Sequence, residues 1–117
     1  MSGTSNSTAD KLLAAAGGDA DLARELATLF ITELERLLAE ARAAAARGDG
    51  INLRKILHML RGSAGTLGFG GVADAALAVE LRVPGAASVA TDLAEELARL
   101  SAACDAADRE TQAYLRQ

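Results

Sequence analysis

Residues 53–71, LRKILHMLRGSAGTLGFGG, have the spacing of an amphipathic helix that ends at a cluster of glycines. On a helical wheel with about 100° per residue, a stripe within about 60° of Leu53 is entirely apolar. It consists of Leu53, Ile56, Leu57, Leu60, Ala64 and Leu67. The spacing therefore predicts a helix over 53–67 with one buried stripe, and Gly68 helps to end it.

Two further helices are expected before this one. A short helix over 10–16 ends at Gly17-Gly18, and a long one follows the N-cap residue Asp19 and runs to about residue 47. A turn over 48–52 offers Asp49 or Asn52 to cap the next helix. The long helix has apolar residues at intervals of three and four, which we assign to the core: Leu22, Leu26, Leu29, Phe30, Leu34, Leu37, Leu38 and Ala41.

The chain after residue 71 predicts two more helices. One covers 72–83 and ends at Pro84-Gly85, and the last opens at Ser88. The face of the last helix holds Val89, Leu93, Leu97, Leu100, Cys104, Ala107, Thr111 and Tyr114. The whole pattern predicts an all-α protein, an antiparallel four-helix bundle with a short extra N-terminal helix. We expect residues 1–9 to be a disordered leader or linker and residues 10–117 to form the bundle domain.

Composition narrows the possible functions. The 117 residues suit one domain, and they are 50% hydrophobic but only 3% aromatic, with few Val and Ile residues to build strands. A net charge of −4 argues against nucleic acid as the main partner. The single cysteine, Cys104, excludes an intramolecular disulfide and a cysteine zinc site, and is expected in the core.

The sequence also argues against membrane insertion. No apolar run approaches the ~18–20 residues that span a bilayer. The polar start, MSGTSNSTAD, lacks the basic and apolar regions of a signal peptide. We therefore expect a cytoplasmic protein that does not contact membranes.

The only histidine, His58, lies off the core stripe, at about 140° from Leu53 on the same wheel. Around it, Arg61, Arg54, Gly65, Gly62 and Lys55 lie at about 80°, 100°, 120°, 180° and 200°. A glycine inside a helix costs ~1 kcal/mol relative to alanine. Because Gly62 faces solvent, we interpret it as leaving a flat surface that another protein can approach closely.

An exposed imidazole offers a nucleophilic nitrogen at neutral pH. Ser63 lies at about 280° on the wheel, away from His58, so the two do not form a hydrolase pair. One histidine without clustered carboxylates predicts no metal site. The remaining chemistry is a histidine that accepts a group and passes it on. A phosphoryl group suits this role, because nearby cations would offset its charge.

The motif formed by His58, Arg61, Gly62, Ser63 and Leu67-Gly68 resembles the histidine-containing phosphotransfer (HPt) domains of bacterial two-component phosphorelays. Their pattern is a histidine, two residues, a basic residue, glycine, a small residue and then a Leu-Gly or Phe-Gly pair. The resemblance covers most of the chain, from about residue 19 to the end. The segment GTLGF, residues 65–69, is also similar to the phosphotransfer domain that begins chemotaxis histidine kinases.

In the chemotaxis group a glutamate on the next helix holds the other ring nitrogen, and Glu80 matches that position. The sequence departs from these patterns twice. Arg61 stands where the family usually has lysine, and Leu77 stands where the chemotaxis group has a second histidine. A relay between two histidines is therefore not expected.

The resemblance implies that His58 takes a phosphoryl group from a receiver-domain phospho-aspartate and passes it to an aspartate of another receiver. The domain would carry the group without autokinase activity and without a cofactor of its own, because the receiver supplies Mg²⁺. Arg61 would steady the phosphoryl oxygens, and Glu80 would fix the tautomer of the ring. The docking surface implied for receivers comprises Gly62, Gly65, Met59, Arg54 and Lys55. Phe69 is a further candidate for its apolar part, although a phenylalanine is more often in the core of such a bundle.

Two other functions stay open. One is a non-catalytic helical adaptor that binds receiver or kinase domains without phosphotransfer, although such a protein has no need of the His58–Arg61–Gly62 set. The other is a dimerisation module of a sensor kinase, in which an acidic residue usually follows the histidine; here Met59 follows it. A mass measurement in solution discriminates between these functions, because a monomer favours the phosphoryl carrier.

Overall fold

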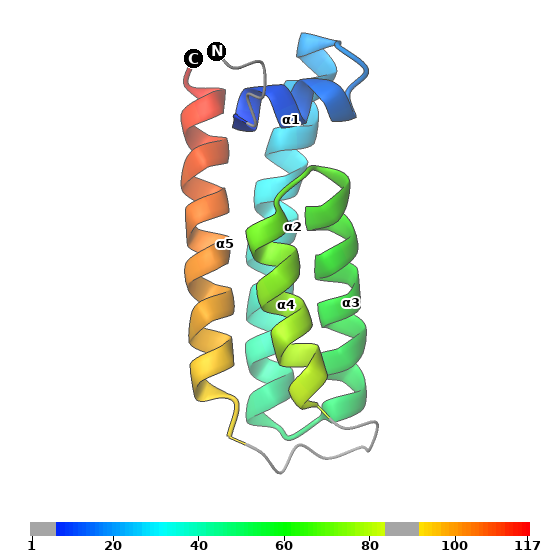
Figure 1. The fold of residues 1–117 in the computed structure, drawn as a ribbon, viewed down its shortest axis with the longest axis vertical. Coiled ribbons are helices and arrows are strands. Elements are labelled where there is room, and N and C mark those ends of the chain that lie inside the picture. Colours follow the sequence, from blue (N-terminus) through cyan, green and yellow to red (C-terminus); the bar gives the residue numbers. More distant parts are fainter. Residues whose placement is uncertain (1–6, 84–91) are drawn as a thin grey trace.

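The computed structural model describes residues 7–83 and 92–117, which form helices and no β-strand. The helices are α1 (Thr8–Ala15), α2 (Ala20–Ala46), α3 (Gly50–Thr66), α4 (Gly70–Arg82) and α5 (Ala94–Leu115). The last four run antiparallel in chain order (Figure 1). They close into a bundle in which α2 and α4 each pack against both α3 and α5. The predicted all-α four-helix bundle with an extra N-terminal helix is confirmed.

Helix α3 buries the stripe predicted from its sequence. All six stripe residues are buried: Leu53, Ile56, Leu57, Leu60, Ala64 and Leu67. The helix begins three residues earlier than predicted, because the Asp49 side chain caps it by accepting a hydrogen bond from Asn52 N at 3.1 Å. It ends at Thr66, one residue before the predicted end. Gly68 follows with a φ of 80°, and Phe69 N donates to Ala64 O at 2.8 Å.

The core predicted for helix α2 was wrong in part. Its buried residues are Ala23, Ala27, Phe30, Leu34, Leu37, Ala41 and Ala44. Leu22 and Leu29 were assigned to the core, but both are exposed, Leu29 by 65%. Leu29 lies about 100° from Phe30 around the helix, so it falls beside the true stripe. The alanines in that stripe have small side chains, which let neighbouring helices approach closely.

Helix α1 covers one end of the bundle, above the short hairpin of α3 and α4 (Figure 1). It buries Leu12 fully and places Lys11 Nζ 5.4 Å from the centre of the Phe69 ring. Phe69 is buried, so it belongs to the core and not to the docking surface, and it stacks on Phe30 with ring centres 4.6 Å apart. The helix starts at Thr8, inside the predicted leader, and residues 1–6 of that leader lie outside the described residues.

The last two helices also differ from prediction at their ends. Helix α4 starts at Gly70, two residues early, and ends at Arg82. Helix α5 starts at Ala94, where the Asp92 carboxylate accepts a hydrogen bond from Ala94 N at 2.9 Å. The predicted start at Ser88, with Val89 and the Pro84-Gly85 break, lies outside the described residues. The rest of the predicted face of α5 is buried or half-buried: Leu93, Leu97, Leu100, Cys104, Ala107, Thr111 and Tyr114.

No helix in the described part of the chain is both long and apolar enough to cross a membrane. Cys104 lies in the core, as predicted. Burial raises the pKa of its thiol to about 11, and the charge of Asp105 adds to this effect. Because the folded state favours the neutral thiol, the raised pKa adds to the free energy of unfolding at neutral pH. This added stability falls as the pH rises toward the thiol pKa of about 11.

We expect Cys104 to react slowly in the folded protein, because the thiolate is the reactive form and burial suppresses it. At pH 8, alkylation by iodoacetamide should be at least about tenfold slower than in protein unfolded by urea. Mass spectrometry over time measures both rates, with free cysteine in the same urea as the control for reagent activity. Equal rates in the folded and unfolded protein would contradict the buried position.

Candidate functional site

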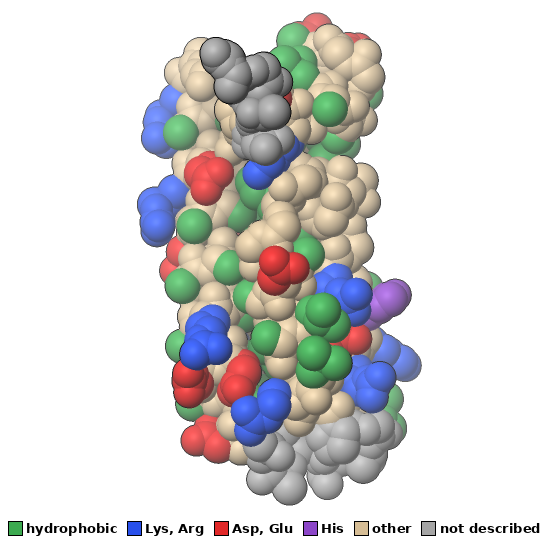
Figure 2. All heavy atoms as spheres, viewed as in Figure 1, with side chains coloured by type: hydrophobic (Ala, Val, Ile, Leu, Met, Phe, Trp, Pro, Cys, Tyr) green, Lys and Arg blue, Asp and Glu red, His purple; other side chains and the backbone are tan. Residues whose placement is uncertain are grey.

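His58 lies in the middle of α3 and is exposed, as its helical phase predicts. Its neighbours on the helix surface are the residues three and four positions away, namely Arg54, Lys55, Arg61 and Gly62. Figure 2 shows the histidine projecting from the surface with Lys and Arg side chains beside it. The helix therefore surrounds one imidazole with three cations and one residue that has no side chain.

The cations differ in their partners. Arg54 and Lys55 are exposed, and neither forms an ion pair within residues 7–83 and 92–117. Arg61 is half-buried and pairs with a carboxylate of α4. The surface around His58 is thus positive although the chain carries a net charge of −4. Such a surface attracts an anionic group to the ring.

Glu80 is the partner of Arg61. Arg61 NH1 donates to Glu80 Oε1 at 2.9 Å, and only 15% of the Glu80 side chain is exposed. Within the described part of the chain, the His58 ring makes no hydrogen bond. The contact between Glu80 and the ring, expected from the chemotaxis resemblance, therefore stays a prediction, and the structure gives this carboxylate a different partner.

Gly62 and Gly65 lie on the exposed side of α3, next to His58. A Cβ atom built on either glycine meets nothing within 4 Å outside the helix itself. The packing of the bundle therefore does not require glycine at these positions. Met59, the remaining predicted docking residue on this helix, is 46% exposed. Together the three residues form a low, partly apolar surface next to His58.

A groove between α2 and α3 continues this surface. It is lined by Leu26, Leu29 and Glu33 from α2 and by Gly62, Ser63 and Thr66 from α3, among others. The sequence reasoning missed the contribution of α2, because it placed Leu29 in the core. The signal was present in the sequence: Ala23, Ala27 and Phe30 form a better-phased stripe, which leaves Leu29 outside it.

Comparison with known families decides the assignment. The family model described as Hpt domain matches residues 25–110, which include His58, Arg61, Gly62 and Glu80. The chain belongs to the Hpt domain family. Hpt domains act as phosphoryl carriers and interact with receiver domains. Searches among curated proteins and among solved structures gave no match.

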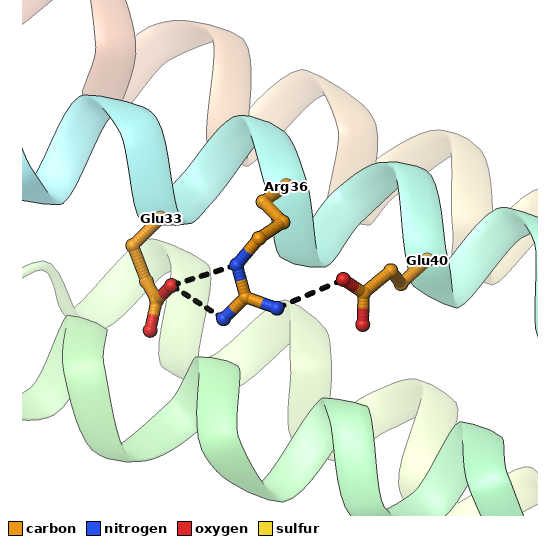
Figure 3. A network of polar contacts seen from close by, with 3 residues as sticks. All are labelled: Glu33, Arg36 and Glu40. Atoms are coloured by element: carbon orange, nitrogen blue, oxygen red, sulfur yellow. Dashed lines mark hydrogen bonds and ion pairs between the residues drawn. The ribbon is translucent and has the colours of Figure 1, made fainter.

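The α2 edge of the groove in this Hpt domain carries an ion-pair network (Figure 3). Arg36 donates from NH2 to Glu33 Oε1 at 2.6 Å and from NH1 to Glu40 Oε2 at 2.8 Å. The hydrogen bond to Glu33, followed by that to Glu40, raises the pKa of Arg36. One cation between two carboxylates leaves this edge negative, whereas the surface around His58 is positive.

The described residues of this Hpt domain include no cluster of three His, Cys, Asp or Glu side chains placed to hold a metal ion. Among these residues, the imidazole ring of His58 lies at the centre of the positive surface. Its exposure leaves room for a second protein to bring a reacting group to it. The arrangement is suited to accepting an anionic group on a ring nitrogen.

Proposed function

We propose that His58 of this Hpt domain accepts a phosphoryl group from the phospho-aspartate of one receiver domain and passes it to an aspartate of another. The observation that supports this most is that the one histidine of the chain is exposed at the centre of a positive surface. As the resemblance implies, the carrier acts as a monomer in the bacterial cytoplasm and has no autokinase activity.

In the proposed transfer, the unprotonated nitrogen of the His58 ring, the one farther from the backbone, attacks the phosphorus atom of the aspartyl phosphate. A nitrogen–phosphorus bond forms, and the bond between phosphorus and the aspartate oxygen breaks. The receiver recovers its carboxylate, and the proton on the other ring nitrogen stays in place. Passing the group to the second receiver reverses these bond changes.

The cations near the ring stabilise the transferred group. Arg61 has N–H donors beyond the one that binds Glu80, and these would bind phosphoryl oxygens. Arg54 and Lys55 add positive charge one turn earlier on the helix. Mg²⁺, which the receiver supplies when it docks, offsets further phosphoryl charge.

The receiver would dock on the low surface formed by Gly62, Gly65 and Met59, with Arg54 and Lys55 at its border. The groove toward α2 extends this surface and adds the exposed Leu29. Weak signalling encounters use small interfaces of this kind, which bind and release quickly. Open space above both glycines supports a close approach of the receiver to the ring.

The function is tested by incubating the protein with a panel of receiver domains phosphorylated by acetyl phosphate. We expect at least one receiver to transfer its label, and we expect the acquired label to be lost in acid but stable in base, as a phosphohistidine is. The starting receiver should lose its label at the same rate. A mass measurement in solution accompanies the assay and should give a monomer.

Other outcomes would overturn the proposal. A folded monomer that binds receivers but takes up no label from any of them is an adaptor. A stable dimer that shows no uptake is a dimerisation module. A label that survives in acid lies on a hydroxyl group and excludes phosphohistidine.

A further inference from the structure

The ion pair between Arg61 and Glu80 is one of two ion pairs in the described residues that join neighbouring helices through a mostly buried carboxylate. It connects α3 to α4, with a donor–acceptor distance of 2.9 Å, a half-buried guanidinium and a carboxylate that is only 15% exposed. A charge-assisted hydrogen bond with little solvent around it holds its partners better than an exposed surface pair. The pair therefore fixes where the guanidinium of Arg61 lies.

The fixed position matters because Arg61 follows His58 by three residues and shares its side of α3. An arginine side chain without a partner samples many rotamers, and its charge is then spread over a wide volume. In this chain one nitrogen of the guanidinium is bound to Glu80, and the planar fork keeps its remaining N–H groups in a fixed relation to that bond.

We propose that Glu80 is a positioning residue that acts on phosphotransfer through Arg61 and not through the His58 ring. This inference rests on the proposed function and assigns Glu80 its partner there. The carboxylate anchors the guanidinium from one side and leaves its other donors for the phosphoryl oxygens. The hydrogen bond that Glu80 makes in the described part of the chain goes to Arg61, and the His58 ring makes none there.

Charge and position predict opposite effects of removing Glu80, which makes the proposal testable. If only charge mattered, Glu80→Gln would leave the surface more positive and would speed phosphoryl uptake. If the carboxylate positions Arg61, the same change releases the guanidinium and slows uptake. We expect uptake to slow by roughly tenfold, as misplaced catalytic groups typically do.

The experiment is a double-mutant cycle in the full chain, with Glu80→Gln, Arg61→Ala and the combination of both. The donor is the phosphorylated receiver that transfers fastest to the unaltered protein, and uptake is followed in a single turnover as a function of receiver concentration. We expect Glu80→Gln to lower the maximal rate and not the half-saturating concentration. In the Arg61→Ala background it should change the rate by less than about twofold.

The matched control is Glu96→Gln, which breaks the other such pair, Arg82 NH1 to Glu96 Oε2 at 2.6 Å. Glu96 is as well shielded as Glu80, with 14% exposure, but it lies on α5, across α4 from α3. We expect this variant to melt at a temperature close to that of Glu80→Gln and to take up phosphoryl at the unaltered rate. A loss of rate in both variants would assign the effect to stability and overturn the proposal.

A second readout follows the ring directly. Because the chain has one histidine, ¹⁵N labelling of histidine gives ring signals from His58 alone. We expect Glu80→Gln to leave the ring tautomer unchanged. A changed tautomer, or an equal slowing with and without Arg61, would show that Glu80 acts on the ring. An unchanged rate would show no positioning role, whereas no uptake by the unaltered protein would reject the proposed function and this inference with it.

Discussion

Replacing His58 with glutamine should abolish phosphoryl uptake from every receiver while the protein keeps its fold. Glutamine is polar and similar in reach, but its amide nitrogen is not a nucleophile. His58 is exposed and makes no hydrogen bond within residues 7–83 and 92–117, so its loss leaves no buried group without a partner. We expect the free energy of unfolding to change by less than about 0.5 kcal/mol. Circular dichroism during urea titration measures it.

The controls for this experiment are two substitutions that remove hydroxyl groups from α3. Ser63→Ala and Thr66→Val remove the two hydroxyl side chains of α3, and neither should remove the label. A His58→Gln protein that still acquires acid-labile phosphate would reject His58 as the acceptor. Loss of uptake together with unfolding would point to a structural role, and the titration detects that case.

Replacing Gly62 with glutamine should leave the protein well folded but slow phosphoryl transfer. A Cβ at this position meets nothing within 4 Å, so a side chain fits without strain. Gly62→Ala should stabilise the protein by about 1 kcal/mol, because alanine is the better helix former. Gly62→Gln should also fold well, but its side chain would stand one turn from the ring, where the receiver approaches. We expect transfer to slow by at least about tenfold through a higher half-saturating concentration.

Gly71 provides a matched control for this pair of substitutions. It is also a helical glycine with open space where a Cβ would lie, but it borders a hollow with Lys11 and Glu110, beside α1 and α5. Gly71→Gln should therefore leave the transfer kinetics unchanged. If Gly62→Gln transfers as fast as the unaltered protein, the glycine surface next to His58 is not where receivers dock.

The sequence predicted α3 well because its pattern is unambiguous. Six apolar residues fall on one stripe, and the glycines and cations on the other side of the helix exclude that side from the core. Helix α2 was harder, because it contains more leucines than its buried stripe can hold. The spacing of the leucines placed Leu22 and Leu29 in the core, whereas the packed helix buries Ala23 and Phe30 beside them. Close helix packing favours small side chains in ways that a count of leucines does not predict.

The partner of Glu80 could not be read from the sequence. Arg61 and Glu80 are 19 positions apart and lie on different helices. Their contact depends on the rotation of α4 against α3, and a wheel drawn for one helix does not contain that rotation. The family resemblance implied a contact between Glu80 and the ring, and this chain has arginine at position 61, where the family usually has lysine. A longer, planar side chain at that position reaches its carboxylate differently.

The beginning of α1 lies against the end of α5. Thr8 Oγ1 of α1 donates to Glu110 Oε1 of α5 at 2.9 Å. Figure 1 shows the ribbons of these two helix ends side by side. A domain whose entry and exit points adjoin can be inserted into a loop of a host protein without separating its own helices. Both attachment points then share one end of the bundle, while His58 stands on its side, in the middle of α3. This geometry leaves His58 accessible to partner proteins both in a free-standing domain and in a domain inserted into a host protein.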